Sequence, residues 1–231
     1  RHTTNSNHRY HKWKNLIHGF EPMAANQLWA ADITYIMLNN GDVCYLHLIT
    51  DAYSRMIVGW ELADTLRASI TIKALEQAIS QTGGVSLEGL IHHSDRGVQY
   101  CCDDYVRTLQ THKIKISMTE DYNPTDNAIA ERANGVIKTE TVYSRKTFNS
   151  LEHARNVIGR FIHFYNYRRP HMSIGYKIPA VVHTETGAQK KMWKKKNYTK
   201  KMYNNENNGI SLPCRTTGED DGCNHHTVYS I

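Results

Sequence analysis

Three acidic residues stand where their surroundings make a carboxylate unusual: Asp32, Asp95 and Glu131. Asp32 lies inside "LWAADITYIML" (28–38), whose two alternating faces are both apolar, and this pattern predicts a central strand. Asp95 follows a short apolar run at the predicted end of another strand, where open α/β sheets place their ligand-contacting side chains. An isolated buried charge is costly, so we expect Asp32 to be neutral, paired or bound to a cation.

Glu131 lies in "TDNAIAERANGVIKTE" (125–140), which has helical periodicity. At about 100° per residue, one face of this helix is apolar and an opposite stripe is polar. The apolar face contains Ile129, Ala133, Val136 and Ile137, and the polar stripe contains Asn127, Glu131, Asn134 and Lys138. Such a stripe is usually the solvated face of a helix. The alternative is that Glu131 joins the other two acids in one site.

Three carboxylates at one end of a sheet would repel one another unless divalent cations lay between them. Hard oxygen ligands suit Mg²⁺ or Mn²⁺, and two such ions about 3.5–4 Å apart can assist phosphoryl transfer. The chain has 28 Lys and Arg against 22 Asp and Glu, with a net charge of +6. This excess favours a polyanionic partner, above all nucleic acid. The sequence contains no run of about 18 apolar residues, so no membrane span is predicted.

The elements that must position these acids form an α/β pattern with a five-stranded mixed sheet. We expect a meander of strands at 28–38, 43–50 and 55–62, the first two joined through Asn40-Gly41. Helices are predicted at about 67–81, 103–112, 123–144 and 151–166, and further strands at 87–93 and 113–118. We expect an N-terminal arm at 1–27, a catalytic core at 28–186, and a tail at 187–231 without a core, basic and then rich in Asn and Gly.

The tail begins with seven lysines between positions 190 and 201, among them Lys194, Lys195 and Lys196. Together with Trp193 and Tyr198 they predict sequence-independent DNA affinity, and the alternative is a solvated, disordered extension. The five cysteines form no paired framework, which indicates a reducing compartment. A metal cluster is conceivable in the tail, but its spacing matches no zinc pattern and a disordered tail is preferred. That cluster would contain Cys214, Cys223, His225 and His226.

The order of the three acids, with 35 residues between Asp95 and Glu131, resembles the D,D-35-E signature of the retroviral-integrase superfamily. Four blocks are similar to those of bacterial insertion-sequence transposases whose catalytic polypeptide comes from a second reading frame. These blocks are "WAADITYI", "HSDRGVQY", "DNAIAERANGVIKTE" and "FYNYRRPHMSIGYKIP". The resemblance covers roughly residues 1–185 and, as four ordered blocks at family spacing, it is highly specific.

The resemblance implies an RNase H-like fold in which Asp32, Asp95 and Glu131 are catalytic ligands of Mg²⁺ or Mn²⁺, with two ions bound. It implies metal-dependent cleavage of DNA at the ends of an insertion sequence, followed by strand transfer. Expected DNA contacts, those of the tail included, are Asn134, Lys138, Arg168, Arg169, His171, Lys194, Lys195 and Lys196. Expected partners are element ends, target DNA, further copies of the chain on DNA, and a helix-turn-helix protein from an upstream reading frame. We expect no membrane partner and a location in the bacterial cytoplasm, associated with the nucleoid. The family's helix-turn-helix module is not evident before Trp29, so we expect it to be missing from this chain.

Two rival functions remain open: a purely hydrolytic RNase H-like nuclease, and a catalytically silent DNA-binding relic. Four further residues carry minor expectations. Asp51 is interpreted as a turn residue, and Gly97 is expected to bend the chain after Asp95. His92 and His93 are interpreted as structural, with direct substrate contact as the alternative.

Overall fold

The structure is a computed structural model that describes residues 6–120, 127–142 and 148–189. The chain divides into two compact units, 1–194 and 195–231, and every described residue belongs to the first. The lysines of the tail and the cysteine–histidine cluster at 214–226 therefore lie outside the described residues. Within the described part, no helix combines the length and the apolar character needed to traverse a bilayer.

A five-stranded sheet in the order β3-β2-β1-β4-β5 confirms the predicted mixed sheet. The strands β1 (Leu28–Met37), β2 (Val43–Asp51) and β3 (Ile57–Ala63) form the antiparallel meander. The short strands β4 (Ile91–Ser94) and β5 (Lys115–Met118) continue the sheet in parallel from β1. Because β1 pairs with β2 on one side and β4 on the other, it is central, as its two apolar faces predicted.

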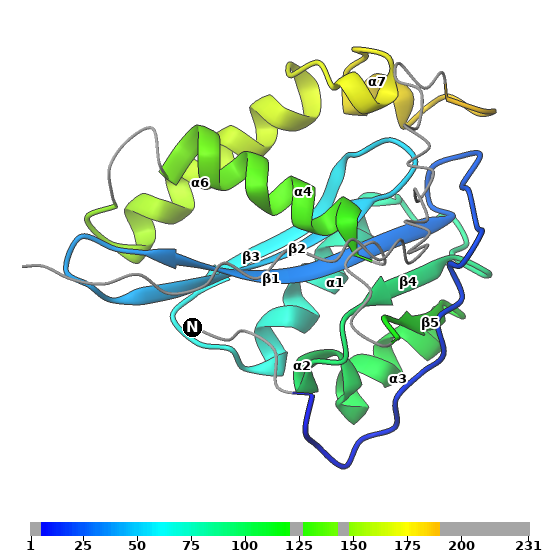
Figure 1. Ribbon diagram of the computed structural model, residues 1–231, viewed down its shortest axis with the longest axis horizontal. Coiled ribbons are helices and arrows are strands. Elements are labelled where there is room, and N and C mark those ends of the chain that lie inside the picture. The colour runs from blue at the N-terminus through cyan, green and yellow to red at the C-terminus, as the bar shows by residue number, and fades with distance from the viewer. Residues whose placement is uncertain (1–5, 121–126, 143–147, 190–231) are drawn as a thin grey trace, which may run out of the picture. The chain divides into compact units, whose positions relative to one another are not determined.

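Helices cover both faces of the sheet (Figure 1). One face carries α1 (Ala68–Gln81), α2 (Val98–Cys101) and α3 (Asp103–Thr111). The opposite face carries α4 (Ala128–Ile137) and α6 (Leu151–Tyr167), and α7 (Pro179–Val182) packs against α6. A π-helical turn, η1 (Lys138–Val142), continues α4, and a 3-10 turn, η2 (Met172–Ile174), follows α6. The four-residue helices α2 and α7 were not predicted, because such short segments carry too little periodicity.

Two hydrophobic clusters, one on each face, hold the sheet between its helices. Trp29, Ala31 and Ile33 of β1 project into the cluster with α1 and α3. Ile36 of β1 projects into the other cluster, together with Ile137 of α4 and the apolar side chains of α6. The alternation of β1 therefore places Asp32 on the same face as Ile36, beneath α4.

Between residues 6 and 23, the described part of the N-terminal arm runs beside β5 and contains no helix or strand. The amide of Leu16 donates to Ser117 Oγ at 2.8 Å, and the amide of Asn15 donates to Glu120 Oε1 at 2.9 Å. His8 Nε2 lies 2.9 Å from the carbonyl oxygen of Arg96, the residue after Asp95. The arm is therefore part of the described unit and borders the candidate site.

Candidate active site

The strand register brings Asp32 and Asp95 together. In the parallel pair of β1 and β4, Leu28 lies opposite Ile91 and Ala30 lies opposite His93. Continuing the same register by two residues aligns Asp32 with Asp95, which is the first residue after β4. Two acids that are 63 positions apart in the sequence thus lie side by side at the end of β4.

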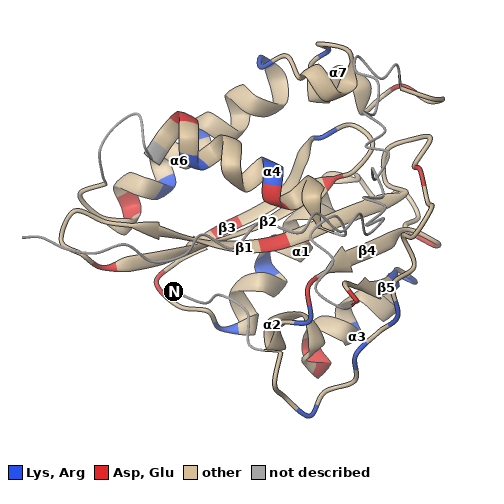
Figure 2. Cartoon of the chain, viewed as in Figure 1, with Lys and Arg blue, Asp and Glu red and all other residues tan. Residues whose placement is uncertain are grey.

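Glu131 comes from α4, which is fixed to β1 by two side-chain amides. Asn127 Nδ2 donates to the carbonyl oxygen of Ala31 at 3.2 Å, and Asn134 Nδ2 donates to Asp32 Oδ2 at 2.7 Å. Both asparagines are buried, so this part of the polar stripe faces the sheet and not the solvent. Glu131 itself is exposed. Acidic positions of β1 and α4 lie close together in Figure 2.

The electrostatics of Asp32 reflect the proximity of the other two acids. Burial raises the pKa of Asp32 to about 7, and the negative charges of Asp95 and, more weakly, Glu131 contribute to this rise. The hydrogen bond from Asn134 opposes the shift, because it stabilises the charged carboxylate. Asp32 is therefore a carboxylate that would gain from a nearby cation.

Gly97 sets the position of the Asp95 carboxylate. Its backbone N–H donates to Asp95 Oδ1 at 2.9 Å. The chain bends at Arg96, directly before Gly97, and the backbone angles of Gly97, φ −64° and ψ 144°, are open to any residue. A Cβ at this position would instead lie 2.9 Å from Asp95 Oδ1 and 3.1 Å from Gln99 Oε1. A side chain at position 97 would therefore displace the Asp95 carboxylate.

The residues present fit a hard divalent cation by the chemistry of their donors, which are all carboxylate oxygens. As placed, however, no group of three or more His, Cys, Asp or Glu side chains among the described residues is arranged to hold a metal ion. Asp32 and Asp95 are partly buried, whereas Glu131 is exposed. An exposed glutamate can change rotamer without repacking the core. Glu131 can therefore move its carboxylate without disturbing the packing of the core.

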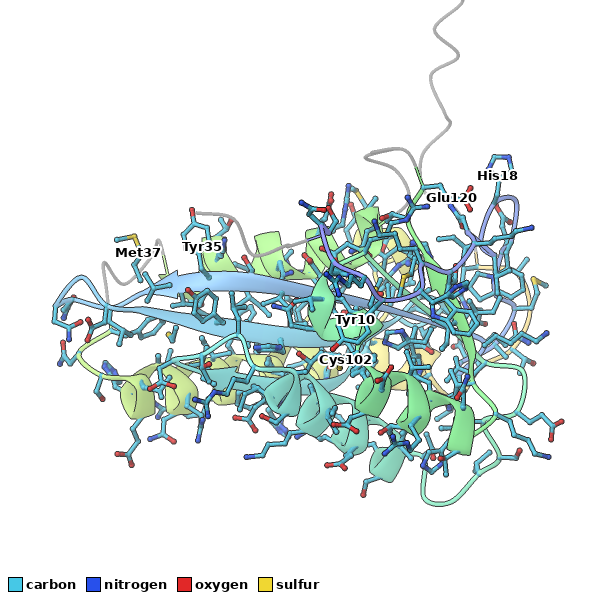
Figure 3. The ribbon with its side chains drawn as sticks, turned by 90° about the horizontal axis from the view of Figure 1, so that it is seen from below. Tyr10, His18, Tyr35, Met37, Cys102 and Glu120 are labelled. Atoms are coloured by element: carbon cyan, nitrogen blue, oxygen red, sulfur yellow. The ribbon has the colours of Figure 1, made fainter. Side chains whose placement is uncertain are left out.

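Lys138, one of the expected DNA contacts, lies against the strand that carries Asp32. Its Nζ is 4.4 Å from the ring centroid of Tyr35, which is a cation–π distance. Burial lowers the pKa of Lys138, and the negative charge of Asp32 opposes this shift. Tyr35 and Met37 project from the same side of β1 (Figure 3), and Met37 is 52% exposed. The ammonium group therefore lies beside a partly exposed surface close to the acids.

The expected contacts after α6 differ in their surroundings. Arg168 is exposed at the end of α6. Arg169 forms a bidentate ion pair with Glu140, with Nε 3.1 Å from each carboxylate oxygen. His171 is buried, with its ring 4.3 Å from that of Tyr165. Thus Arg168 is directly accessible to a large ligand, whereas Arg169 already has an acidic partner.

His92, His93 and Asp51 have the structural surroundings that the sequence suggested. His92 Nε2 lies 2.9 Å from the hydroxyl of Tyr105, and His93 Nδ1 lies 2.8 Å from Ser117 Oγ. Burial lowers the pKa of His92 to about 3, so its ring is neutral. The Asp51 carboxylate is fully buried and accepts hydrogen bonds from the Ser54 amide and hydroxyl, both at 2.8 Å. It stabilises the turn between β2 and β3.

Sequence reasoning missed the supporting roles of Asn127, Asn134 and Gly97. Asn134 was expected to contact DNA, but its amide is directed at Asp32. The sequence signal for the two asparagines was their position beside Glu131 on one helical stripe. Side-chain amides at such positions can donate hydrogen bonds to a neighbouring strand as well as to water. For Gly97, its place two residues after Asp95 was the only signal.

Comparisons with known proteins agree with this geometry. Two family models, both described as integrase core domain, match residues 22–124 and 112–179. A putative transposase for insertion sequence element IS986/IS6110 of Mycobacterium tuberculosis (strain ATCC 25618 / H37Rv) is 36% identical over 74% of this chain and 62% of the relative. The insertion element IS600 uncharacterized 31 kDa protein of Shigella sonnei is 40% identical over 77% of this chain and 65% of the relative. The chain therefore spans less than two thirds of the length of these relatives.

Solved structures share the fold at lower sequence identity. The integrase catalytic core domain of HTLV-2, solved in complex with magnesium, is 20% identical, with a TM-score of 0.55. The match covers 71% of this chain and 99% of that domain. A chain of the simian T-cell lymphotropic virus intasome is also 20% identical, with a TM-score of 0.61 over 79% of this chain and 62% of its own length. These likenesses show that the fold is RNase H-like.

Proposed function

We propose that this chain cleaves DNA strands at the ends of an insertion sequence and transfers them to a target. The basis of the proposal is that the chain belongs to the integrase core family and groups with bacterial insertion-sequence transposases. In the first step a water molecule attacks a phosphodiester at the element end and releases a 3′-hydroxyl. In the second step that hydroxyl attacks a phosphodiester of the target, so that one bond forms as another breaks. No covalent intermediate with the protein is needed.

The observation that best supports this proposal is the approach of Asp95 and Glu131 to Asp32, whose pKa rises to about 7. Two acids, from a strand end and a helix, thus act on a third acid that is buried on a central strand. This arrangement is unfavourable in the absence of a cation, and carboxylates with a raised pKa gather at functional sites.

Asp32, Asp95 and Glu131 would hold Mg²⁺ or Mn²⁺, with two ions as the expected number. When bound, these ions supply Lewis-acid assistance to the attacking and leaving oxygens of a phosphodiester. Asn134 holds Asp32 through its amide, and the Gly97 N–H holds Asp95. Lys138 provides a point charge for a phosphate near the scissile bond.

The remaining parts of the proposal concern partners and domain limits. DNA binding is supported by the net charge of +6, and assembly on DNA as a homo-oligomer is proposed from the family. A helix-turn-helix protein from an upstream frame is proposed as a partner on the same basis. The proposed domains are an arm at 1–27, the catalytic core at 28–186, and a basic tail from 187 that includes Lys194, Lys195 and Lys196.

The test uses a labelled duplex that carries the inverted repeat flanking the coding sequence, incubated with the full chain and Mg²⁺. We expect nicking at the repeat end and joining to a second duplex. Glu131→Gln should abolish both reactions while DNA affinity remains within about 2-fold, because one exposed charge contributes little to binding. The matched control is Glu76→Gln, which changes an exposed glutamate of α1 on the opposite face.

Nicking without joining would identify the hydrolytic nuclease as the correct function. DNA binding without either reaction, in Mg²⁺ and in Mn²⁺, would identify a silent relic. Normal nicking by Glu131→Gln would refute the assignment of Glu131.

A further inference from the structure

A second polar site lies on the other flank of α4, in a cavity of about 490 Å³. Its walls come from the bulged end of β2, the turn between β2 and β3, the first turns of α4, and the segment after α6. Arg55 and Arg132 both line this cavity. Within the described part of the chain, neither arginine forms an ion pair with an acid.

The two guanidinium groups act on each other as like charges. Burial lowers the pKa of Arg55. Tyr165 and Asp51 oppose this shift, and the positive charge of Arg132 makes a smaller contribution that lowers the pKa further. Arg55 has a left-handed backbone conformation, with φ 68°, and its Nη1 donates to the carbonyl oxygen of Ala52 at 2.5 Å. A left-handed conformation is uncommon for a residue other than glycine and is unfavourable. The turn therefore maintains a partly buried arginine next to another arginine.

Two buried polar atoms of the same cavity have no hydrogen-bond partner within the described part of the chain. They are Thr50 Oγ1 and His171 Nε2, in residues that are 1% and 7% exposed. Buried polar atoms almost always have a partner, so an unpaired atom in a cavity wall indicates an absent ligand or water. Thr50 lies at the register shift between β2 and β3, a place where bulges redirect side chains.

The charge balance of the cavity favours an anion. Arg169 also lines it but is paired with Glu140, and the buried Asp51 acts on Arg55 without forming an ion pair with it, so Arg55 and the exposed Arg132 supply the positive charge available to a ligand. Ala128 and Ile129, in the first turn of α4, lie in the same wall, and the side chain of Asn127 does not cap this helix because it bonds to β1. A helix N-terminus carries a partial positive charge that attracts anions.

We propose that this cavity binds a backbone phosphodiester of DNA, held jointly by Arg55 and Arg132 with Thr50 as a hydroxyl donor. Burial and the positive charge of Arg169 lower the pKa of His171 to about 4, so its imidazole is neutral and the donors are the two guanidinium groups and the Thr50 hydroxyl. Arginine pairs well with phosphate because its planar guanidinium donates two parallel hydrogen bonds. The inference rests on the proposed function for the identity of the ligand as DNA.

Two features favour a phosphodiester within a strand over a small free anion. The cavity is much larger than one phosphate group, and its wall includes the half-exposed side chains of Met172 and Tyr176, which suit the apolar surface of a sugar. Arg132 is also the neighbour of Glu131 in the sequence, about 100° further around α4. A strand that crosses α4 can therefore reach both sites.

The test compares the salt dependence of DNA binding by the full chain, measured by fluorescence anisotropy on a duplex of about 30 base pairs and arbitrary sequence, long enough to cover the whole face. Each neutralised phosphate contributes about 0.9 to the slope of log affinity against log salt. Arg132→Ala and Arg55→Gln should each reduce the slope by about 0.9, and the double variant by no more, because both residues hold one phosphate. Between about 50 and 200 mM salt, each variant should lose about 3-fold less affinity than the parent chain.

The matched control is Arg107→Ala, which removes an exposed arginine from α3 on the opposite face and should leave the slope unchanged. Arg132→Lys keeps the charge and should retain the parental slope. An unchanged slope in Arg132→Ala, or an equal fall in Arg107→Ala, would overturn the proposal.

A second measurement separates the two sources of phosphate by titrating the full chain with inorganic phosphate, followed by phosphorus NMR. Competition between phosphate and DNA that disappears in Arg132→Ala supports the proposal. Phosphate binding that Arg132→Ala abolishes, combined with an unchanged DNA slope, would show a free-anion site and overturn it. These readouts do not need strand cleavage, so an inactive parent chain would refute the proposed function and leave this inference standing.

Discussion

Replacing Gly97 by alanine tests whether the position of one carboxylate determines activity. The new Cβ would lie 2.9 Å from Asp95 Oδ1, whereas the favourable van der Waals separation of non-bonded heavy atoms is about 3.5 Å or more. The carboxylate must therefore move by roughly 0.5 Å or rotate away. The backbone at φ −64° accepts alanine without strain, so the perturbation acts on the side chain of Asp95 and not on the fold.

A displacement of this size is large for a catalytic group and small for the protein. Catalytic constellations require placement within about 0.5 Å, and an error of about 1 Å can cost about 100-fold in rate. We expect strand cleavage in Mg²⁺ to fall by roughly 10- to 100-fold. The contacted atoms are ends of side chains, so the free energy of unfolding should change by less than about 1 kcal/mol, or roughly 2–4 °C in Tm.

The assay is single-turnover nicking of the end-repeat duplex, with Tm measured on the same samples. Gly135→Ala is the matched control, because Gly135 is exposed on α4 and a Cβ there would meet nothing within 4 Å. This control should keep full activity and gain up to about 1 kcal/mol in stability, since alanine favours a helix over glycine. Full activity in Gly97→Ala, with an unchanged Tm, would refute the reasoning about Asp95.

Three further predictions address charge. Asp32 has a pKa of about 7 in the folded chain against 3.8 when unfolded, so its contribution to stability is present below about pH 4 and is lost as the pH rises towards 7. Thermal melts in EDTA should therefore show that Asp32→Asn stabilises the chain more at about pH 8 than at about pH 5. Added Mg²⁺ should stabilise only the parent chain. Lys138→Glu should weaken binding of the end-repeat duplex by at least about 10-fold, because it converts an attraction to a nearby phosphate into a repulsion. Mn²⁺ binding, measured by EPR, should stay within about 2-fold. Equal DNA affinity of the variant and the parent chain would exclude Lys138 as a phosphate contact. Truncation after Gly187 removes the seven lysines between 190 and 201. The slope of log DNA affinity against log salt should become shallower by about 0.9 for each phosphate that these lysines neutralise, with Tm unchanged. An identical slope would show that the tail does not contribute to DNA binding.

Much of the sheet was predictable because its strands carry local patterns. The two apolar faces of 28–37 indicate a central strand, and Asn40-Gly41 indicates a tight hairpin. Strand ends are also local, so the placement of Asp95 at the end of β4 followed from the sequence. These features depend on residues within a few positions of one another.

The orientation of α4 could not be read from its sequence, because a polar stripe suits solvent and a polar site equally well. Burial of Asn127 and Asn134 against β1 decides between the two, and it depends on a strand that lies far earlier in the chain. The same packing leaves Glu131 exposed, so among the described residues the three acids do not form a closed ligand set.

What the sequence by itself determined is the identity of the three acids and the strand, strand end and helix that carry them. Only the tertiary structure placed Asp32 where burial and two neighbouring acids raise its pKa to about 7. Only the tertiary structure brought Arg55 of a turn beside Arg132 of a helix. The reason is physical: patterns of hydrophobicity and turn residues act between near neighbours, whereas burial and charge interactions depend on distances in space.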